Sequence, residues 1–335
     1  MRLHPDLRAL RDDDAPQRHA QDAAFAAIAA WRARPEVARV MADLDAFASV
    51  RPMAECAALS ALFDDEGACA DAFAARFVAD MVEVLLRQPL AHVPLRHFTD
   101  GTISTLLLGR SGGVSLLLCA VDGTRLAAGS PPTTATFSGA ETWERVLTGS
   151  GTAELVALAE RPNGARFDRR SIRLAPGKVI GREGGRQAML LHSVHGMLVT
   201  LKLQRRRSDA GAAQARPTRE YDLATGVLVH QSAGSLRESR QHVAMALLGR
   251  MGRAEAVPLL AAMAGEADRP EGLRWEALRE CLALDTAAGF AALTALARSP
   301  DDPLAMPAGA LRAQLVERHP ELAVRLEGIA PCLRS

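Results

Sequence analysis

Apolar residues follow three successive patterns along the chain. Before about residue 90 they recur every three or four positions, which is typical of amphipathic helices, and Pro35 and Pro52 interrupt the pattern. From His92 they alternate with polar residues, and turns such as Asp-Gly and Asn-Gly recur as in antiparallel β proteins. Past Ser235 the helical spacing returns. The pattern predicts an α+β protein with roughly eight to ten strands between two helical flanks. Its three predicted domains are residues 1–90, 91–234 and 235–335.

The C-terminal helical region carries a candidate repeat. Residues 240–264 align with residues 274–298, and the alignment pairs Leu259 with Leu293. A degenerate third copy is expected at 304–316. Each copy would be a helix pair that cannot bury its apolar face alone, so that neighbouring copies stack. The pattern resembles HEAT-type repeats, and a simple helical cap on the β region is the alternative interpretation.

Charge and composition narrow the classes of partner. The 40 Lys and Arg residues nearly balance the 39 Asp and Glu residues, so the formal charge of +1 gives no global field that would attract nucleic acid or an anionic membrane. No apolar run approaches the ~18 residues of a membrane span, and the N-terminus lacks the apolar core of a signal peptide. The five scattered cysteines fit reduced thiols. The sequence therefore predicts a cytoplasmic protein without a membrane or nucleic-acid partner.

Two segments of the β region carry recognisable motifs. In GAETWERVLTGSGTAELVAL (139–158), Glu144 precedes Gly151 with six residues between them, and in RSIRLAPGKVIGREGG (170–185) Pro176 opens a Pro-Gly turn. These segments resemble the two motifs of the cupin family, which has a double-stranded β-helix or jelly-roll fold. The resemblance implies a cupin-like antiparallel β barrel with a pocket, and such barrels commonly pair edge to edge as homodimers.

The resemblance also implies a set of metal ligands, most of which this chain lacks. The histidines of the first motif would fall within residues 136–140, TFSGA, and the histidine of the second motif near Ile180 or Arg182. Glu144 is the remaining ligand, and one carboxylate cannot hold a transition metal tightly. We therefore expect no metal cofactor, and the resemblance then implies binding rather than a reaction.

A divergent metal-dependent cupin enzyme, an oxygenase or isomerase, is the alternative. It would hold iron or another divalent first-row metal with Glu144 and with histidines outside the motifs, namely His192, His195, His97 and His230. The segment LLHSVHG (190–196) resembles the late strands of cysteine dioxygenase-type cupins, and Lys202 stands where that comparison expects a functional histidine.

Local patterns favour simpler roles for the same histidines. A strand over 189–194 would end in a turn at His195 and Gly196, and a spacing of three would place His192 and His195 on opposite faces. The segments of His97 and His230 are the first and last predicted strands, which often neighbour each other in a closed barrel. We expect each histidine to be a turn or hydrogen-bonding residue unless three of these ligands converge on one point.

Arginines on the predicted strands suggest a different chemistry. An inward-facing guanidinium needs a carboxylate or phosphate partner, so Glu144, Arg182 and Arg96 are the candidate ligand-binding residues for a small anionic ligand. The alternative is that these arginines lie on the solvated outer face of the strands. Alternation along the strand would put Glu144 and Val146 on one face and Arg145 on the other.

The favoured function is therefore a non-catalytic binding or regulatory protein. Its barrel would hold a small ligand without metal, and its C-terminal helices would present a surface to a protein partner. A metal-dependent enzyme is the rival hypothesis, and a purely structural scaffold with a filled barrel is the third. A cluster of metal ligands in space would favour the enzyme, whereas an apolar or arginine-lined pocket would favour binding.

Overall fold

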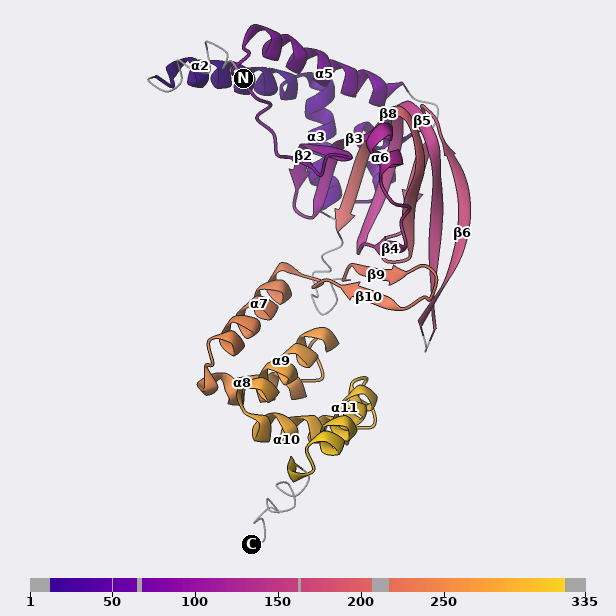
Figure 1. The fold of residues 1–335 in the computed structure, drawn as a ribbon. Coiled ribbons are helices and arrows are strands. Elements are labelled where there is room, and N and C mark those ends of the chain that lie inside the picture. Colours follow the sequence, from indigo (N-terminus) through magenta and orange to yellow (C-terminus); the bar gives the residue numbers. More distant parts are fainter. Residues whose placement is uncertain (1–12, 50, 65–67, 162–163, 207–216, 323–335) are drawn as a thin grey trace. The chain divides into compact units, whose positions relative to one another are not determined.

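A computed structural model describes residues 13–49, 51–64, 68–161, 164–206 and 217–322 (Figure 1). Contacts divide the described residues into two compact units. The first holds those up to residue 206 and Arg219–His230, and the second holds residues 217 and 218 and those from residue 231 onward. The protein is α+β with antiparallel sheets. The finer division into three domains stays a prediction.

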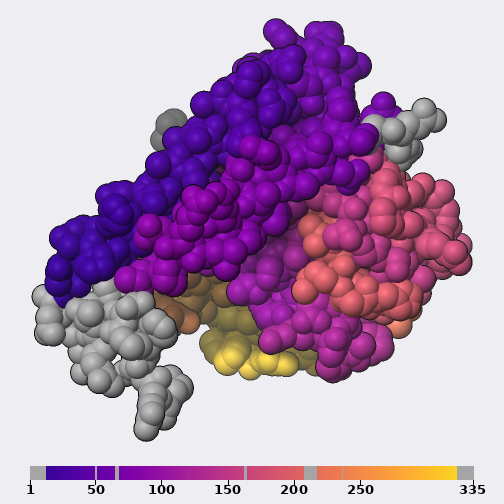
Figure 2. All heavy atoms as spheres, turned by 90° about the horizontal axis from the view of Figure 1, so that it is seen from above, coloured from indigo at the N-terminus to yellow at the C-terminus, as the bar shows by residue number. Residues whose placement is uncertain are grey.

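The first unit opens with helices. Their bounds are α2 (Ala15–Arg32), α3 (Pro35–Ala48), η1 (Met53–Glu55), α4 (Ala57–Ser60), η2 (Ala61–Phe63) and α5 (Cys69–Arg87). The apolar spacing read from the sequence turns one face of α2, α3 and α5 inward, where Trp31 lies 5.0 Å from Phe77 between ring centroids. Figure 2 shows these helices as a layer of indigo and purple atoms against the magenta strands.

The strands form two sheets. Their bounds are β1 (His97–Thr99), β2 (Ile103–Ser111), β3 (Val114–Asp122), β4 (Thr134–Phe137), β5 (Ala140–Arg161), β6 (Gly164–Leu174), β7 (Val179–Arg182), β8 (Gln187–Arg206), β9 (Arg219–Asp222) and β10 (Leu228–Gln231). The larger sheet has the order β1-β2-β3-β8-β5-β6, with β7 also paired to β5, and the smaller sheet has the order β10-β9-β4. A short helix, α6 (Gly123–Ala128), follows β3.

The larger sheet is open along the described strands, because its terminal strands β1 and β6 are not hydrogen-bonded to each other. The predicted closed barrel is therefore not confirmed. The first and last strands, which would be neighbours in such a barrel, belong to different sheets.

Two strands are longer than the sequence predicts. β5 continues through Gly149 and Gly151, and β8 continues through His195 and Gly196, where we expected a turn. The predicted turn is wrong because Ser150 pairs with His195 next to a β-bulge, so that the strand pairing continues past the glycines. Both strands thus continue past the positions where we expected them to end.

The two faces of the larger sheet have different coverings. One face packs on the N-terminal helices through residues that include Leu116, Leu201 and Leu203. Arg145 of β5 points to that side, where it contacts Asp71 of α5. The opposite face carries Glu144 and the rest of the site described below, as alternation along β5 predicts.

The second unit is helical. Its bounds are α7 (Leu236–Arg250), η3 (Ala254–Ala256), α8 (Val257–Gly265), α9 (Glu271–Leu284), α10 (Thr286–Ala297) and α11 (Ala305–Arg318). Arg274 of α9 is buried in this unit, where its Nε donates to the Ala264 carbonyl at 3.0 Å and its terminal nitrogens donate to Asp302. The helix pairs α7–α8 and α9–α10 match the two aligned segments, but a HEAT-type array stays a prediction. No helix in the described part of the chain has the length and hydrophobicity needed to cross a membrane.

Candidate functional site

A cavity of about 190 Å³ lies on the face of the larger sheet that the N-terminal helices leave uncovered. Five strands, β2, β3, β5, β7 and β8, supply most of its lining. Aliphatic side chains make up the larger part of that lining. The polar side chains that join them are Thr105, Cys119, Glu144, Arg182, Thr200 and Lys202.

Strand register explains why these polar residues meet. Residues opposite each other in an antiparallel ladder share a face of the sheet. Lys202 of β8 lies opposite Glu144 of β5, and Thr200, two residues earlier, lies opposite Cys119 of β3. Arg182 is two residues from Ile180, which pairs with Glu144 and also lines the cavity. The register therefore gathers two cations, one carboxylate and one thiol in a small area.

Glu144 is fully engaged by its neighbours. One carboxylate oxygen accepts a hydrogen bond from an Arg182 terminal nitrogen at 2.6 Å, and the other accepts from the Thr200 hydroxyl at 3.1 Å. The Glu144 side chain is 10% exposed and that of Arg182 is 14% exposed. Burial strengthens such a charge-assisted pair because little water screens it.

Lys202 differs from Arg182 because no described carboxylate forms an ion pair with it. Its positive charge is nevertheless close enough to Cys119 to oppose part of the rise in the pKa of that thiol, which is described next. Counting only the lining residues, Arg182 and Lys202 carry two positive charges and Glu144 carries one negative charge. The cavity therefore has one uncompensated positive charge.

The thiol of Cys119 is not a nucleophile at neutral pH. Burial and the negative charge of Glu144 raise its pKa to about 11, and the smaller opposing effects of Lys202, Thr200 and Arg182 do not reverse the shift. Nucleophilic and metal-binding cysteines need the thiolate form. Cys119 therefore contributes a small, protonated side chain to the lining of the cavity.

Arg182 also carries a buried donor that is unused. Its Nε atom is inaccessible to solvent and has no hydrogen-bond partner among the described residues. Leaving such a donor unpaired costs about 1–3 kcal/mol. Because this atom is closed to solvent, an acceptor in the cavity does not reach it in this arrangement.

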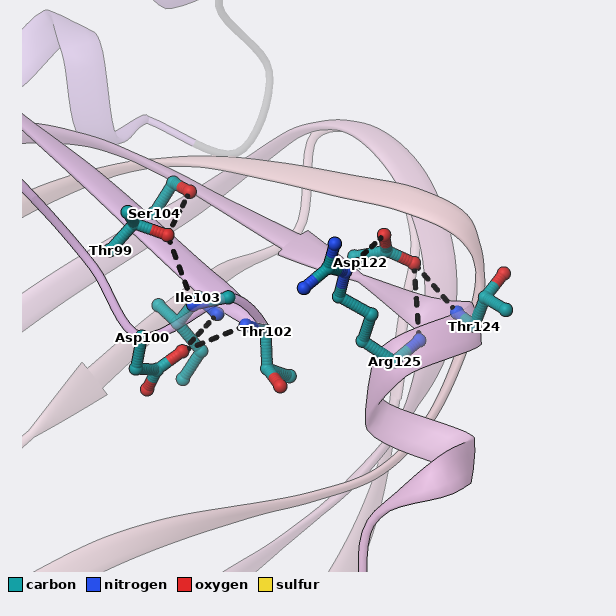
Figure 3. Close-up of polar contacts among 9 residues, drawn as sticks. Thr99, Asp100, Thr102, Ile103, Ser104, Asp122, Thr124 and Arg125 are labelled. Atoms are coloured by element: carbon teal, nitrogen blue, oxygen red, sulfur yellow. Dashed lines mark hydrogen bonds and ion pairs between the residues drawn. The ribbon is translucent and has the colours of Figure 1, made fainter. Parts of the chain in front are cut away.

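Two aspartates hold the turns beside β2 and β3, the strands that carry Ile103 and Val121 (Figure 3). The Asp100 carboxylate accepts hydrogen bonds from the backbone of Thr102 and Ile103, and these bonds lower the pKa of Asp100. Asp122 accepts from Thr124 and Arg125 and so caps the N-terminus of α6. Because Ile103 pairs with Val121 and both line the cavity, the two turns hold apolar side chains in place there.

The remaining predicted site residues lie outside this lining. Arg96 is exposed just before β1, and His97 is exposed on β1 itself. His230 is exposed on β10, in the smaller sheet. The structure therefore brings Glu144 and Arg182 together and leaves Arg96 apart.

His192 and His195 are exposed at two separate points of β8. The His192 Nε2 lies 3.7 Å from a Glu154 carboxylate oxygen, and the His195 Nδ1 lies 3.3 Å from the Ser150 hydroxyl. No group of three or more His, Cys, Asp or Glu side chains with a metal-binding arrangement occurs in the part of the chain that the structure describes.

The cavity itself does not suit the metal that the cupin resemblance implies. Glu144 is the one carboxylate in its lining, no imidazole joins it, and the nearby thiol is protonated. Arg182 and Lys202 would repel a divalent cation, whose protein ligands are carboxylates, imidazoles and thiolates. The donor set therefore does not fit a metal ion.

A larger groove of about 540 Å³ lies among α3, α4 and α5. Its lining consists mainly of small and apolar side chains. Its two arginines bind partners on their own helices, Arg39 the Pro35 carbonyl of α3 and Arg76 the Asp80 carboxylate of α5. Binding sites combine apolar walls with a few convergent polar groups, so the sheet cavity is the better candidate.

Comparison with known proteins adds little to this description. No family model and no curated protein matches the chain. Similar solved structures include a cupin superfamily protein from Desulfitobacterium hafniense, at 16% identity over 32% of this chain and 81% of that one, with a TM-score of 0.23. The Drosophila melanogaster CENP-C cupin domain has 12% identity over 33% and 76% of the two chains, with a TM-score of 0.26.

A cupin-2 domain from Rhodospirillum rubrum is similar to the same degree, at 14% identity over 34% of this chain and 70% of that one, with a TM-score of 0.24. All three similarities cover about a third of the chain. At these TM-scores they assign neither a family nor a ligand, so the function has to be argued from the side chains of the cavity.

Proposed function

We propose that the first unit is a non-catalytic, cupin-like binding module whose cavity holds a small anion without a metal. The uncompensated charge of Lys202 is the observation that carries this proposal. Glu144 would not repel the anion strongly, because Arg182 and Thr200 already engage its carboxylate. The cupin-like character rests on the two sequence motifs and on the position of Glu144 in the cavity.

The chemistry of the cavity favours binding over reaction. A covalent or acid–base mechanism needs a nucleophile or a titratable group that can change protonation near neutral pH. The one thiol in the lining has a pKa of about 11, and the one carboxylate is held in an ion pair. What remains available to a ligand is a fixed positive charge beside apolar walls.

Thermal unfolding in acetate tests the proposal. We expect 100 mM acetate, compared with chloride at equal ionic strength, to raise the unfolding temperature saturably, by roughly 2–5 °C if acetate reaches about ten times its dissociation constant. Lys202→Met should lose most of this increase. Lys178→Met is the matched control, because Lys178 is the only other lysine, is exposed and lies outside the cavity.

Two results would contradict the proposal. One is an acetate effect of equal size in wild type, Lys202→Met and Lys178→Met, which would indicate a general salt effect. The other is stoichiometric iron, zinc, nickel or manganese in the purified protein that is lost on Glu144→Gln substitution, since that would support the rival metal-dependent enzyme.

A further inference from the structure

The polar and apolar side chains of the cavity are sorted along the strands. Three successive rows cross the sheet on this face. The first row joins Ile103, Val121 and Leu198, which are all aliphatic. The second joins Thr105, Cys119, Thr200 and Val146, and the third joins Lys202, Glu144 and Ile180. The polar and charged side chains therefore lie in the second and third rows, and the first row has none.

Further aliphatic residues line the cavity, Val146 and Ile180 in the second and third rows and the others beyond the first row. Val146, Leu174, Ile180, Met189 and Leu191 also line the cavity, and together with Val121 and Leu198 they belong to one packed cluster. Leu126 of α6 packs against the same cluster. Most of this wall is already buried, but Ile103, Met189 and Leu191 are partly exposed. An anion confined to the charged side chains would leave these three facing water, and covering them with hydrocarbon is favourable by the hydrophobic effect.

The size of the cavity limits the ligand. Its volume of about 190 Å³ corresponds to about six water molecules, since one water occupies about 30 Å³ of the liquid. Cavities that enclose drug-sized ligands are larger, about 300–1,000 Å³. A ligand of about six to eight non-hydrogen atoms therefore fits, with its charged group near Lys202 and its hydrocarbon part toward Leu198.

The charge of the cavity limits the ligand further. One net positive charge can neutralise one negative charge, and a second negative charge would lie beside the carboxylate of Glu144 without a partner. A doubly charged phosphate or dicarboxylate is therefore disfavoured relative to a monoanion. A carboxylate also offers two acceptor oxygens to the donors of the Lys202 ammonium.

We propose that the cavity is specific for an aliphatic monocarboxylate of about four to six carbons, an inference that rests on the proposed function and names its ligand class. The carboxylate lies against Lys202, and the alkyl chain extends toward the row of Ile103, Val121 and Leu198.

Isothermal titration of the full chain with acetate, butanoate, hexanoate and octanoate tests this specificity at constant ionic strength. Each added methylene up to hexanoate should tighten the dissociation constant about fourfold, the value expected for burying one methylene group. Octanoate should gain nothing over hexanoate because it exceeds the cavity. Hexanamide, which keeps the shape and loses the charge, should bind at least tenfold more weakly than hexanoate.

Variants separate this inference from the proposed function. Lys202→Met should weaken hexanoate binding at least tenfold, and Lys202→Arg, which keeps the charge, should retain most of the affinity. Lys178→Met should bind as wild type does. The retained binding of Lys202→Arg and Lys178→Met keeps the test decisive if Lys202→Met proves unstable.

Each contrary outcome has a distinct meaning. If succinate or phosphate binds more tightly than butanoate, and does so through Lys202, the proposed function stands and the monocarboxylate specificity is overturned. If affinity is independent of chain length, the specificity is overturned in the same way. If acetate, butanoate, hexanoate, succinate and phosphate all fail to bind, the proposed function fails as well.

Discussion

Cys119 shows how the cavity controls one of its own residues. Its side chain is buried, and Glu144 is the charged group with the largest effect on it. Together, burial and Glu144 raise the pKa of the thiol to about 11 from an ordinary value of 9.0. A raised pKa means that folding favours the protonated thiol. The folded state therefore gains stability from this residue below about pH 9 and loses it as the pH rises through 11.

We predict that this loss can be measured. A shift of two pKa units corresponds to about 2–3 kcal/mol, so the free energy of unfolding in urea should fall by about that amount more in wild type than in Cys119→Ala between pH 9 and pH 11. Parallel pH profiles of the two proteins would show that the thiol is not held in its neutral form.

At the same scale, alternation along β5 could be predicted from the sequence and places Glu144 and Arg145 on opposite faces. The partners of these residues could not be predicted, because they depend on strand register. Lys202 drew notice as a departure from a family pattern, while its position opposite Glu144 follows from the pairing of β5 with β8. Thr200 and Cys119 gave no local signal at all.

At the scale of elements, two glycines explain why β5 is longer than expected. Gly149 has a φ of +88°, and a Cβ atom added there would lie 2.2 Å from the Met197 carbonyl oxygen of β8. A glycine pair of this kind in a sequence usually indicates a turn. Here the same conformational freedom permits a bulge inside a continuous strand, and the alternative is decided by the partner strand β8.

We predict that Gly149→Ala destabilises the first unit by about 2 kcal/mol or more, because the substitution adds both a left-handed backbone conformation and a backbone clash. Gly181→Ala in β7 is the matched control, since an added Cβ atom there meets nothing within 4 Å. Chemical denaturation of both variants provides the measurement. Equal stability of the two would contradict the described register of β5 and β8.

The helical elements show the limit of a repeat read from the sequence. The helical character of the described residues beyond 235 follows from apolar spacing, and α7 to α10 coincide with the aligned segments. Leu259 and Leu293 occupy aligned positions, yet Leu259 is 61% exposed and Leu293 is fully buried. Aligned Ala- and Leu-rich helices thus need not have equivalent neighbours, because composition alone can align them.

At the scale of the whole molecule, the contacts separate two units, and one buried ion pair belongs to the second unit alone. Arg274 is 1% exposed, and its guanidinium is satisfied by Asp302 and the Ala264 carbonyl. The hydrogen bonds from Arg274 lower the pKa of Asp302. The stability that this carboxylate contributes is therefore present at neutral pH and is lost as the pH falls through its lowered pKa.

We predict that Asp302→Ala destabilises the second unit by about 3 kcal/mol, because it leaves the buried charge of Arg274 without its partner. Hydrogen exchange should accelerate in α9 and α10 and remain unchanged in β3, β5 and β8. Asp301→Ala, at the exposed neighbouring position, should change neither. Faster exchange throughout the chain in Asp302→Ala would show that the two units do not open separately.

The predicted protein partner and homodimer also belong to this scale, and both stay predictions. Val243 and Leu247 of α7 and Met251, the residue that follows the helix, are exposed at a spacing of four, whereas Met245 of α7 is buried. An apolar stripe on a helix surface is typical of an interaction face.

The most direct test of the account is to add butanoate to the protein and follow the signal of Lys202 by nuclear magnetic resonance. Reductive methylation with ¹³C labels only two lysines, Lys178 and Lys202, and the N-terminal amine, and it preserves the lysine charge. The account predicts that added butanoate shifts the Lys202 signal saturably and leaves the Lys178 signal unchanged. A Lys202 signal that does not move, or that moves in proportion to that of Lys178, would contradict an anion-binding cavity at this residue.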